Sequence, residues 1–266
     1  YLVVTILGRC REGAVRLFLP PEQFSTDTAL ITDTDHLHLV RVLRARVGED
    51  LTLLDNSGNA YHATITQIEK HTTTAHIHHA VTLNSEPQLS LVVAQALGKG
   101  DKFEQAVQHG TEAGGTLFIP LTTERCVVEV PHAKREARLL RWQAIAKGAA
   151  EQSGRLRIPR ILPVMSFSQF LEWSARETAA TSLLDVAPST QSLHTYLSRF
   201  PTPPDSLAMA IGPEGGWSNT EVSRAKEANI ERVNLGGRIL RTETAALVAL
   251  SQVLYHFEAY RPEQRA

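Results

Sequence analysis

The sequence predicts an α/β fold with a mostly parallel sheet, preceded by a small β-rich domain. Two observations lead to this prediction. The later part of the chain alternates buried apolar runs with amphipathic helical patterns, and the first third has short alternating runs joined by turns. The 266 residues, 42% of them hydrophobic, suffice for two domains with apolar cores. This composition excludes disordered, collagen-like and small disulfide-rich proteins.

Residues 15–83 carry the pattern of the small domain. Its apolar runs are residues 16–20, 50–55 and 63–68, and the turn at 56–59 joins the last two as a hairpin. Asp33 and Asp35 are expected to cap a short helix that continues to Leu43. We therefore expect a small β-barrel-like domain with one or two helices.

Residues 84–88 are polar, include a proline, and separate the two patterns, so we place the domain boundary there. From residue 89 to 266 strands are expected to alternate with helices. The expected strands are 89–96, 116–120, 181–186, 206–212 and 232–235. The expected helices are one through Phe103 and Gly110, one at 133–151, one capped by Ser218 and Glu221, and one at 242–260 with Thr242 as N-cap.

Residues 1–14 precede both patterns, and we treat them as an N-terminal extension. No basic segment comes before the apolar residues 1–7, so no signal peptide is expected. No apolar run is long enough to span a bilayer. Cys10 and Cys126 stand in dissimilar contexts, which gives neither a disulfide framework nor a cysteine-based zinc site. We expect a cytoplasmic protein without membrane or metal partners.

The net charge of −1 conceals an uneven distribution of charge. Residues 15–86 hold five basic and nine acidic residues, whereas residues 87–160 hold eleven basic and seven acidic residues. Lys134, Arg138 and Arg141 recur three or four positions apart, so they share one face of the expected helix. Such a row is typical of phosphate contacts, and this concentration favours a nucleic-acid partner over a merely solvated helix face.

The sequence IGPEGGW at residues 211–217 follows an expected buried strand and precedes a capped helix. Ligands collect at the carboxyl ends of parallel strands, and glycines there let the backbone approach a ligand closely. A tight strand-to-helix turn is the alternative interpretation. The segment has neither P-loop nor G-x-G-x-x-G spacing, which disfavours a phosphate cradle and a nicotinamide oxidoreductase.

The sequence LGGRILRTETA at residues 235–245 also joins a strand end to a helix start. Ile239 and Leu240 are expected to bury this loop, and arginines in a buried loop usually need an anionic partner. That partner is either a ligand or, in a purely structural role, Glu243 or Glu214.

Four histidines, His71, His76, His78 and His79, cluster near an expected hairpin. Weak metal binding is one interpretation, because His76 and His78 share a strand face. No cysteine or well-spaced carboxylate accompanies them, so a solvent-facing strand is favoured.

Five motifs in this order resemble one family. They are RLFLP at 16–20, ER at 124–125, EQSGR at 151–155, IGPEGG at 211–216 and LGGRILRTET at 235–244. The sequence from about residue 15 onward is similar to the RsmE family, bacterial 16S ribosomal-RNA uridine-N3 methyltransferases of the SPOUT superfamily.

The resemblance implies a PUA-like RNA-binding domain followed by a SPOUT domain with a trefoil knot that binds S-adenosylmethionine. It also implies a homodimer in which the helix from Thr242 supplies much of the contact. The donor would be held by the loops after three strands. The residues concerned are Leu184, Asp185, Gly212, Pro213, Glu214, Gly215, Gly216, Leu235, Gly236, Arg238, Ile239, Leu240 and Arg241.

Uracil N3 carries a weakly acidic proton, so the enzyme needs a base or stabilisation of a developing anion. Arg241 is the candidate for the anion or phosphate, and Glu243 is the candidate for the base or for positioning. RNA contacts on the small ribosomal subunit are predicted for Arg16, Lys99, Arg125, Lys134, Arg138, Arg141 and Arg155. The alternatives are another acceptor, such as a ribose 2′-hydroxyl or a transfer-RNA base, and a non-catalytic RNA-binding protein.

Overall fold

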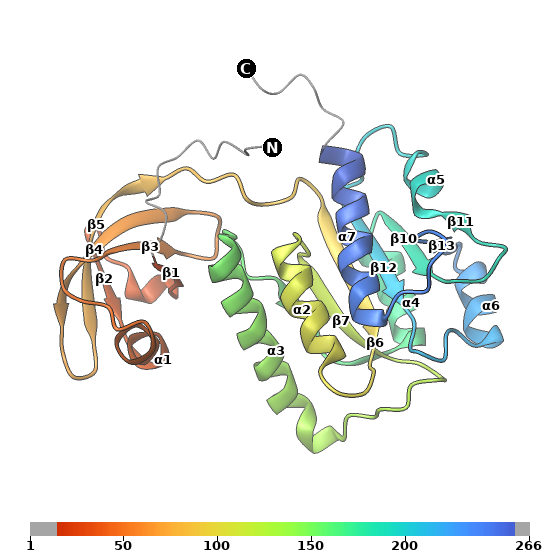
Figure 1. Ribbon diagram of the computed structural model, residues 1–266, viewed down its shortest axis with the longest axis horizontal. Helices are drawn as coiled ribbons and strands as arrows, with labels where there is room; N and C mark the ends of the chain where they lie inside the picture. The colour runs from red at the N-terminus through yellow and green to blue at the C-terminus, as the bar shows by residue number, and fades with distance from the viewer. Residues whose placement is uncertain (1–14, 259–266) are drawn as a thin grey trace. The chain divides into compact units, whose positions relative to one another are not determined.

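The computed structural model describes residues 15–258, and the chain forms two compact units (Figure 1). Of the described residues, the first unit contains Val15–Glu86 together with Ala150–Ile158. The second contains Pro87–Ala149 and Pro159–Glu258. The predicted N-terminal extension, residues 1–14, and the end of the predicted final helix lie outside the described residues.

The first unit is built on a five-stranded sheet. Its strands are β1 (Val15–Phe18), β2 (Thr28–Ile31), β3 (Asp50–Leu54), β4 (Ala60–Ile68) and β5 (Thr73–Val81), in the order β1-β3-β4-β5-β2. β1 pairs with β3 in parallel, and the other pairs are antiparallel. A 3-10 turn (Pro21–Gln23), helix α1 (Asp33–Leu37) and a π-helical segment (His38–Val42) complete the unit.

The predicted hairpin between β3 and β4 is confirmed, because Leu54 pairs with Ala60 across the turn. Asp55 shapes the turn by accepting hydrogen bonds from the backbone N–H groups of Ser57 (2.8 Å) and Asn59 (3.1 Å). Successive strand residues point to opposite faces. Leu51, Leu53, Ala63, Ile65 and Ala75 accordingly form the apolar core on one face of the sheet.

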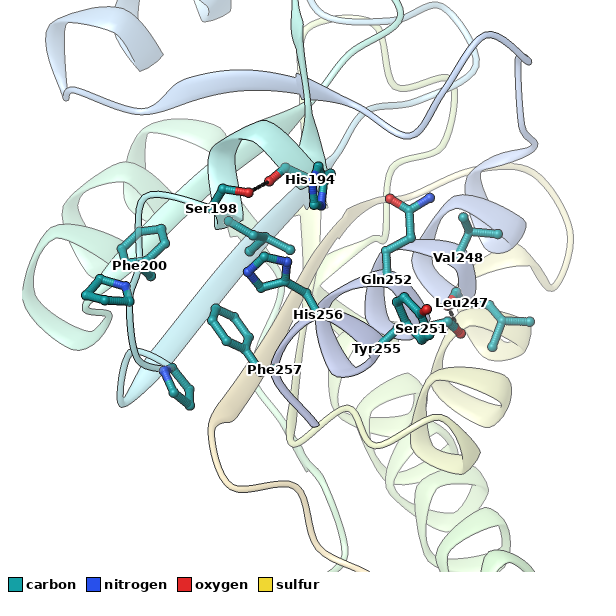
Figure 2. Close-up of a pocket in the computed structure, with 13 residues that line it drawn as sticks. His194, Ser198, Phe200, Leu247, Val248, Ser251, Gln252, Tyr255, His256 and Phe257 are labelled. Carbon is teal, nitrogen blue, oxygen red and sulfur yellow. Dashed lines mark hydrogen bonds between the residues drawn. The ribbon is translucent and has the colours of Figure 1, made fainter. Parts of the chain in front are cut away.

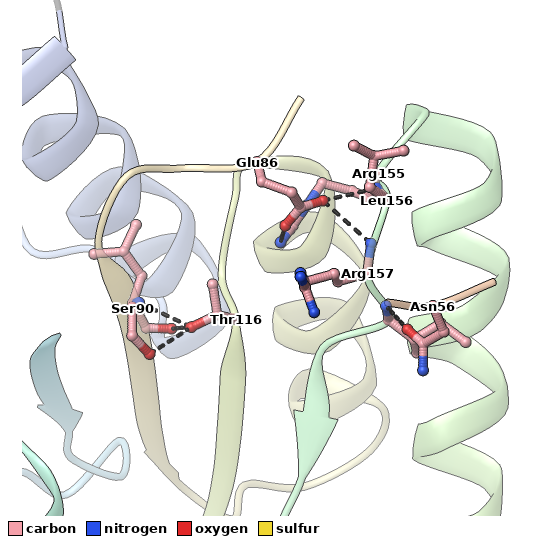
Figure 3. A network of polar contacts seen from close by, with 9 residues as sticks. Asn56, Glu86, Ser90, Thr116, Arg155, Leu156 and Arg157 are labelled. Atoms are coloured by element: carbon pink, nitrogen blue, oxygen red, sulfur yellow. Dashed lines mark hydrogen bonds and ion pairs between the residues drawn. The ribbon is translucent and has the colours of Figure 1, made fainter. Parts of the chain in front are cut away.

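Residues 150–158 group with the first unit, and Glu86 accepts hydrogen bonds from residues of this segment (Figure 3). The Arg155 guanidinium donates to Glu86 at 2.9 and 2.7 Å, and the N–H of Leu156 donates to the same carboxylate at 2.7 Å. Asn56 accepts the N–H of Ile158 at 2.7 Å. The 3% exposure of Arg155 shows that these contacts are internal to the unit.

The second unit is an eight-stranded parallel sheet, as the α/β pattern predicted. Its strands are β6 (Ser90–Ala96), β7 (Leu117–Thr122), β8 (Arg160–Ile161), β9 (Met165–Ser166), β10 (Ala180–Leu184), β11 (Gln191–Ser192), β12 (Ser206–Ile211) and β13 (Glu231–Asn234). The order is β11-β13-β10-β12-β6-β7-β8, and β9 pairs with β7. Neighbouring strands of this sheet pair in parallel throughout the described residues.

Helices cover both faces of this sheet. They are α2 (Lys102–Glu112), α3 (His132–Ser153), α4 (Phe167–Glu177), α5 (Leu193–Leu197), α6 (Asn219–Glu227) and α7 (Thr242–Glu258). Phe167 and Phe170 of α4 and Ala225 of α6 join one apolar cluster with Ile119 and alternate residues of the central strands. α2 and α7 contact β6 from the other face, where Gly110 of α2 lies against Phe118 of β7.

Most predicted elements of the second unit lie within two residues of their expected bounds, and Ser218 and Glu221 form the predicted capping box. The predicted N-cap at Thr242 was wrong. Thr242 is the first helical residue of α7, and the N–H of Ala245 donates to the carbonyl of Arg241. Helix α4 was not predicted, although Ser166 and Gln169 form its capping box.

Candidate functional site

A pocket of about 500 Å³ lies at the carboxyl ends of β10, β12 and β13. Every residue predicted to hold the methyl donor lines it, from Leu184 and Asp185 through Gly212–Gly216 to the loop that ends at Arg241. Residues that sequence reasoning missed also line it. They include Lys102, Val186, Trp217, Asn234 and Thr242. Parallel strands bring these distant loops together because their carboxyl ends meet at one edge of the sheet.

Trp217 fixes the loop after β12. Its indole N–H donates to the carbonyl of Leu184 at 2.8 Å, which ties this loop to the end of β10. A Cβ atom on Gly212 would lie 3.0 Å from the Trp217 ring, so only glycine fits without displacement. Gly216 has φ +68°, which favours glycine, and its N–H donates to Pro213 at 2.9 Å. The glycines therefore serve tight packing and leave backbone facing the pocket.

Two carboxylates at the pocket already have cationic partners. Glu214 forms an ion pair with Lys102, and the hydrogen bond from Lys102 is the main cause that lowers the pKa of Glu214. Asp185 lies 3.1 Å from Arg232 and also accepts the N–H of Ala187 at 3.3 Å. Both side chains are thus held in place by these contacts at the pocket.

The loop between β13 and α7 is exposed, which corrects the prediction that Ile239 buries it. Ile239 is 85% exposed, and Arg238 and Arg241 are also exposed. Asn234 shapes the start of the loop, since its side chain accepts the N–H of Gly236 at 3.1 Å and donates to the Thr190 carbonyl at 3.0 Å. The loop is held at its base and open at its tip.

The structural salt bridges that were the alternative for these arginines are absent among residues 15–258. Glu214 pairs with Lys102, and Glu243 accepts a hydrogen bond from the Thr242 hydroxyl at 3.2 Å. Arg241 lines the pocket, whereas Glu243 is not among the lining residues. The guanidinium of Arg241 is therefore available to an anionic ligand, and Glu243 lies in the first turn of α7 beside it.

The predicted basic residues fall in different surroundings. Lys134, Arg138 and Arg141 line a second cavity of about 430 Å³ between α3 and the start of α2, together with Asp101 and Glu104. Arg141 donates to Glu104 at 2.7 Å. The three cations thus share one face of α3, as the spacing predicted.

The other predicted RNA contacts divide into exposed and buried residues. Lys99 and Arg125 are exposed, and Arg125 donates to the Gly215 carbonyl at 2.9 Å. Arg16 is half-buried on β1. The predicted RNA contact of Arg155 is wrong. Its guanidinium is buried and paired with Glu86, so RNA cannot reach it.

A third cavity, of about 1140 Å³, separates α5 and the segment after it from α7 (Figure 2). His256 and Phe257 of α7 point toward α5. Burial, followed by the charge of His194 at a ring separation of 5.6 Å, lowers the pKa of His256. Tyr255 is 75% exposed beside this groove. One side of α7 is therefore an open apolar surface.

Within the described residues, no group of three or more His, Cys, Asp or Glu side chains is arranged to hold a metal ion. None of the described helices is both long enough and apolar enough to cross a membrane.

Comparisons with known proteins place this geometry in a family. A family model for an RNA methyltransferase domain matches residues 84–254, and one for an RNA methyltransferase PUA domain matches residues 31–77. The chain is 36% identical over 240 residues to ribosomal RNA small subunit methyltransferase E of Synechocystis, covering 90% of this chain and 77% of the relative. It is 33% identical to the Bacillus subtilis protein of that name, covering 89% and 93% of the two chains.

A solved structure gives the same result. The ribosomal RNA small subunit methyltransferase E of Neisseria gonorrhoeae, bound to S-adenosyl methionine, matches with a TM-score of 0.82 at 33% identity, over 93% of this chain and all of the other. Similarity at this level extends over both units. The chain therefore belongs to the ribosomal RNA small subunit methyltransferase E family.

Proposed function

We propose that this protein transfers the methyl group of S-adenosylmethionine to N3 of one decoding-region uridine in 16S ribosomal RNA. The observation that carries the proposal is the pocket at the ends of β10, β12 and β13, which gathers all the predicted donor-binding residues in a chain of this family. The similar Neisseria protein is bound to S-adenosyl methionine.

The pocket fits the donor in size and chemistry. Its volume of about 500 Å³ lies within the usual range for small-molecule sites. Leu184, Ile239 and Leu240 offer apolar contacts for an adenine ring, and glycine backbone offers hydrogen bonds to its edge. When bound, S-adenosylmethionine supplies an electrophilic methyl group on a positively charged sulfur. Asp185 and Glu214 are anions at the rim of that pocket.

Arg241 and Glu243 are proposed to act on the acceptor. A uracil anion that develops when N3 loses its proton would be stabilised by the exposed guanidinium of Arg241. Glu243, in the first turn of α7, is proposed to accept that proton or to orient Arg241. The target base lies in structured RNA and must leave its stack before transfer.

The RNA is proposed to contact the cationic surface of the second unit. Lys134, Arg138 and Arg141 line a cavity beside the β6–α2 loop, and Lys102 at the end of that loop lines the donor pocket. RNA phosphates at α3 would therefore lie near the donor pocket. Lys99 and Arg125 are further proposed contacts, and Arg16 is a proposed contact on the first unit.

A homodimer is proposed to form through α7. The groove beside α7 is apolar and exposes Tyr255, and Ile239 stands exposed at the loop that leads into the same helix. Large apolar side chains exposed in this way favour a protein partner. A second copy there would cover the donor loop.

Donor binding and modification mapping together test the proposed reaction. Calorimetry with S-adenosylmethionine should detect binding to the purified chain. Mass mapping after incubation with unmodified small-subunit particles should then find one new methyl group on a uracil N3. Absence of donor binding would support a non-catalytic RNA-binding protein. A methyl group found on a ribose 2′-hydroxyl or on a transfer-RNA base would show that the enzyme has that acceptor instead of uracil N3.

The proposed roles of Arg241 and Glu243 are tested with Arg241→Ala and Glu243→Gln. At saturating donor, we expect each variant to lose methyl transfer by about 10²-fold or more, because an anion stabiliser or a base is removed. Arg176→Ala, at an exposed position on α4, serves as the control. Full transfer rates in both variants, with normal donor and RNA binding, would rule out these roles.

A further inference from the structure

Four histidine rings lie on the face of the first unit's sheet opposite its apolar core. We call this surface the histidine face; it consists of His62 on β4 and His76, His78 and His79 on β5. The ring centroids of His62 and His78 are 5.2 Å apart, those of His62 and His79 are 5.3 Å apart, and those of His76 and His78 are 5.0 Å apart. Neither the donor pocket nor the α3 cavity uses these residues.

A β-bulge brings the rings together. His62 pairs with His79, whereas the next residue, Ala63, pairs with Ile77, so His78 is the extra residue on β5. A bulge leaves one residue unpaired and re-aims its side chain. His76 and His78 share this face by regular alternation, and the bulge brings His79 onto it as well, within ring contact of His62.

The strand register places a permanently charged residue, Arg16, on the same side of the sheet as the histidine face. His79 pairs with His62, His62 pairs with Thr52, and Thr52 pairs with Arg16 on β1. Partners in register lie on the same face, so this row runs from the histidine face to Arg16. Arg16 is half-buried.

Among the described residues, few acidic groups lie beside the histidine face. Asp50 on β3 lies 3.6 Å from His62 and accepts the Thr64 hydroxyl at 2.9 Å. Glu151, from the segment that packs on the unit, accepts the N–H of Phe18 at 3.0 Å. On β2, His76 is opposite the uncharged Thr28. Protonation of the rings would therefore make this face strongly positive.

Hydrogen bonding leaves imidazole nitrogen atoms available. The Thr64 hydroxyl has one proton, which it donates to Asp50, so Nε2 of His78 must donate to Thr64 at 2.8 Å. Among the described residues, Nδ1 of His78 then has no hydrogen-bond partner. His78 and His79 are exposed, so a ligand can reach them.

We propose that the histidine face binds the phosphate backbone of the RNA substrate, and that its rings take up protons as they bind. The inference rests on the proposed function for the identity of the RNA. Imidazole changes its charge between pH 5 and 8. Rings about 5 Å apart repel one another once charged, and a phosphate bound at their exposed edges offsets that repulsion. RNA binding and protonation therefore favour each other.

A metal ion is the competing ligand for clustered imidazoles. Within the described residues, however, these side chains are not arranged to hold one. Stacked and edge-on rings at these separations present their faces and edges to each other instead of converging their nitrogen atoms on one point. The chemistry of the face thus favours an extended polyanion over a chelated cation.

The test measures RNA affinity as a function of pH in the full chain. The probe is a transcribed 16S decoding-region hairpin, titrated by fluorescence anisotropy from pH 8.0 to 5.5 at fixed ionic strength with a chelator present. The variants are His78→Gln with His79→Gln, which removes two titrating rings, and His78→Lys with His79→Lys, which fixes their charge. His71→Gln is the matched control, because His71 is exposed in the β4–β5 turn outside the face.

We expect the wild-type affinity to rise by about tenfold on acidification, since two protonated rings gain phosphate contacts. The glutamine variant should lose most of that rise. The lysine variant should bind tightly at both pH values, and His71→Gln should follow the wild type. Similar thermal midpoints for all variants would show that these changes in affinity do not reflect loss of folding.

An identical pH dependence in the glutamine variant and the wild type would overturn the inference. It would also be overturned if the rise in affinity required added Ni²⁺ or Zn²⁺ and vanished with the chelator. Donor binding and methyl transfer by the wild type at pH 8.0 are measured in parallel. Their failure would reject the proposed function, whereas their success with an unchanged pH dependence would reject this inference alone.

Discussion

Glycine has opposite effects in two helices of this protein. A Cβ on Gly110 of α2 would lie 2.7 Å from the Phe118 ring, whereas a Cβ on Gly148 of α3 meets nothing within 4 Å. Gly110→Ala should lower the free energy of unfolding by about 1–3 kcal/mol through overpacking. Gly148→Ala should raise it by about 0.5–1 kcal/mol, since alanine loses less backbone entropy in a helix. Urea unfolding of both variants checks the prediction, and two changes of the same sign would contradict it.

Gln95 is the most unusual polar side chain in the interior of the second unit. It is fully buried on β6, beside Ile211 of β12, and among the described residues neither its oxygen nor its nitrogen has a hydrogen-bond partner. Gln95→Met should raise the free energy of unfolding by about 1–3 kcal/mol, because an apolar side chain of similar size avoids the desolvation of an unpaired amide. Thermal unfolding measures this. A destabilised variant would indicate that an internal water satisfies the amide.

At the scale of elements, the ion pair between Glu86 and Arg155 joins the end of α3 to the first unit. Burial tends to raise the pKa of Glu86, but the hydrogen bonds and charge of Arg155, with the N–H groups of Leu156 and Arg157, lower it below 4.5. Glu86→Gln should lower the free energy of unfolding by about 3–5 kcal/mol at pH 7, because it leaves a buried guanidinium without its counter-charge.

The pH dependence of this effect follows from the sign of the pKa shift. A carboxyl with a lowered pKa contributes its stability above its ordinary pKa of 4.5 and loses it as the pH falls through the lowered value. The difference between wild type and Glu86→Gln in urea unfolding should therefore shrink as the pH falls from 7 to below 4.5. Glu22→Gln, at an exposed position, is the control. A difference that is the same at pH 7 and pH 3 would refute this account.

The cationic face of α3 gives a prediction about salt. Arg138 lines the cavity beside α2, and no ion pair or hydrogen bond of Arg138 is found within residues 15–258, whereas Arg141 is paired with Glu104. Arg138→Ala should therefore weaken RNA binding and reduce the slope of log K against log salt by about 0.7. Arg141→Ala should have a smaller effect. Filter binding across a salt series measures both slopes, and Arg176→Ala is the control. An unchanged slope for Arg138→Ala would contradict the proposed contact between Arg138 and RNA.

At the scale of the whole molecule, the exposed side of α7 predicts self-association. Tyr255→Glu should convert the proposed dimer to a monomer, because a charge would be buried in an apolar interface. The affinity for the donor should fall in the monomer, since no second copy would cover Ile239 in the donor loop. Sedimentation velocity and calorimetry test both effects, and Val127→Glu, at an exposed position away from α7, is the control. A monomeric wild type would reject the dimer.

Local patterns determined much of the fold. Apolar runs bounded by glycine and proline predicted β6, β7, β10, β12 and β13, because a strand buried on both faces needs a continuous apolar sequence. The capping box at Ser218 was predicted because it depends on two residues only three positions apart in the chain. β8, β9 and β11 have two residues each, too few for any periodicity, so they could not be predicted.

The sequence by itself determined the α/β class, the small β-rich domain and the motifs of the donor pocket, because each depends on neighbours in the chain. The tertiary structure decided what depends on distant contacts. It buried Arg155 against Glu86, left Ile239 exposed, and brought four histidines together through a bulge. The trefoil knot stays a prediction. Burial and register are set by which segments pack together, and no local pattern records that.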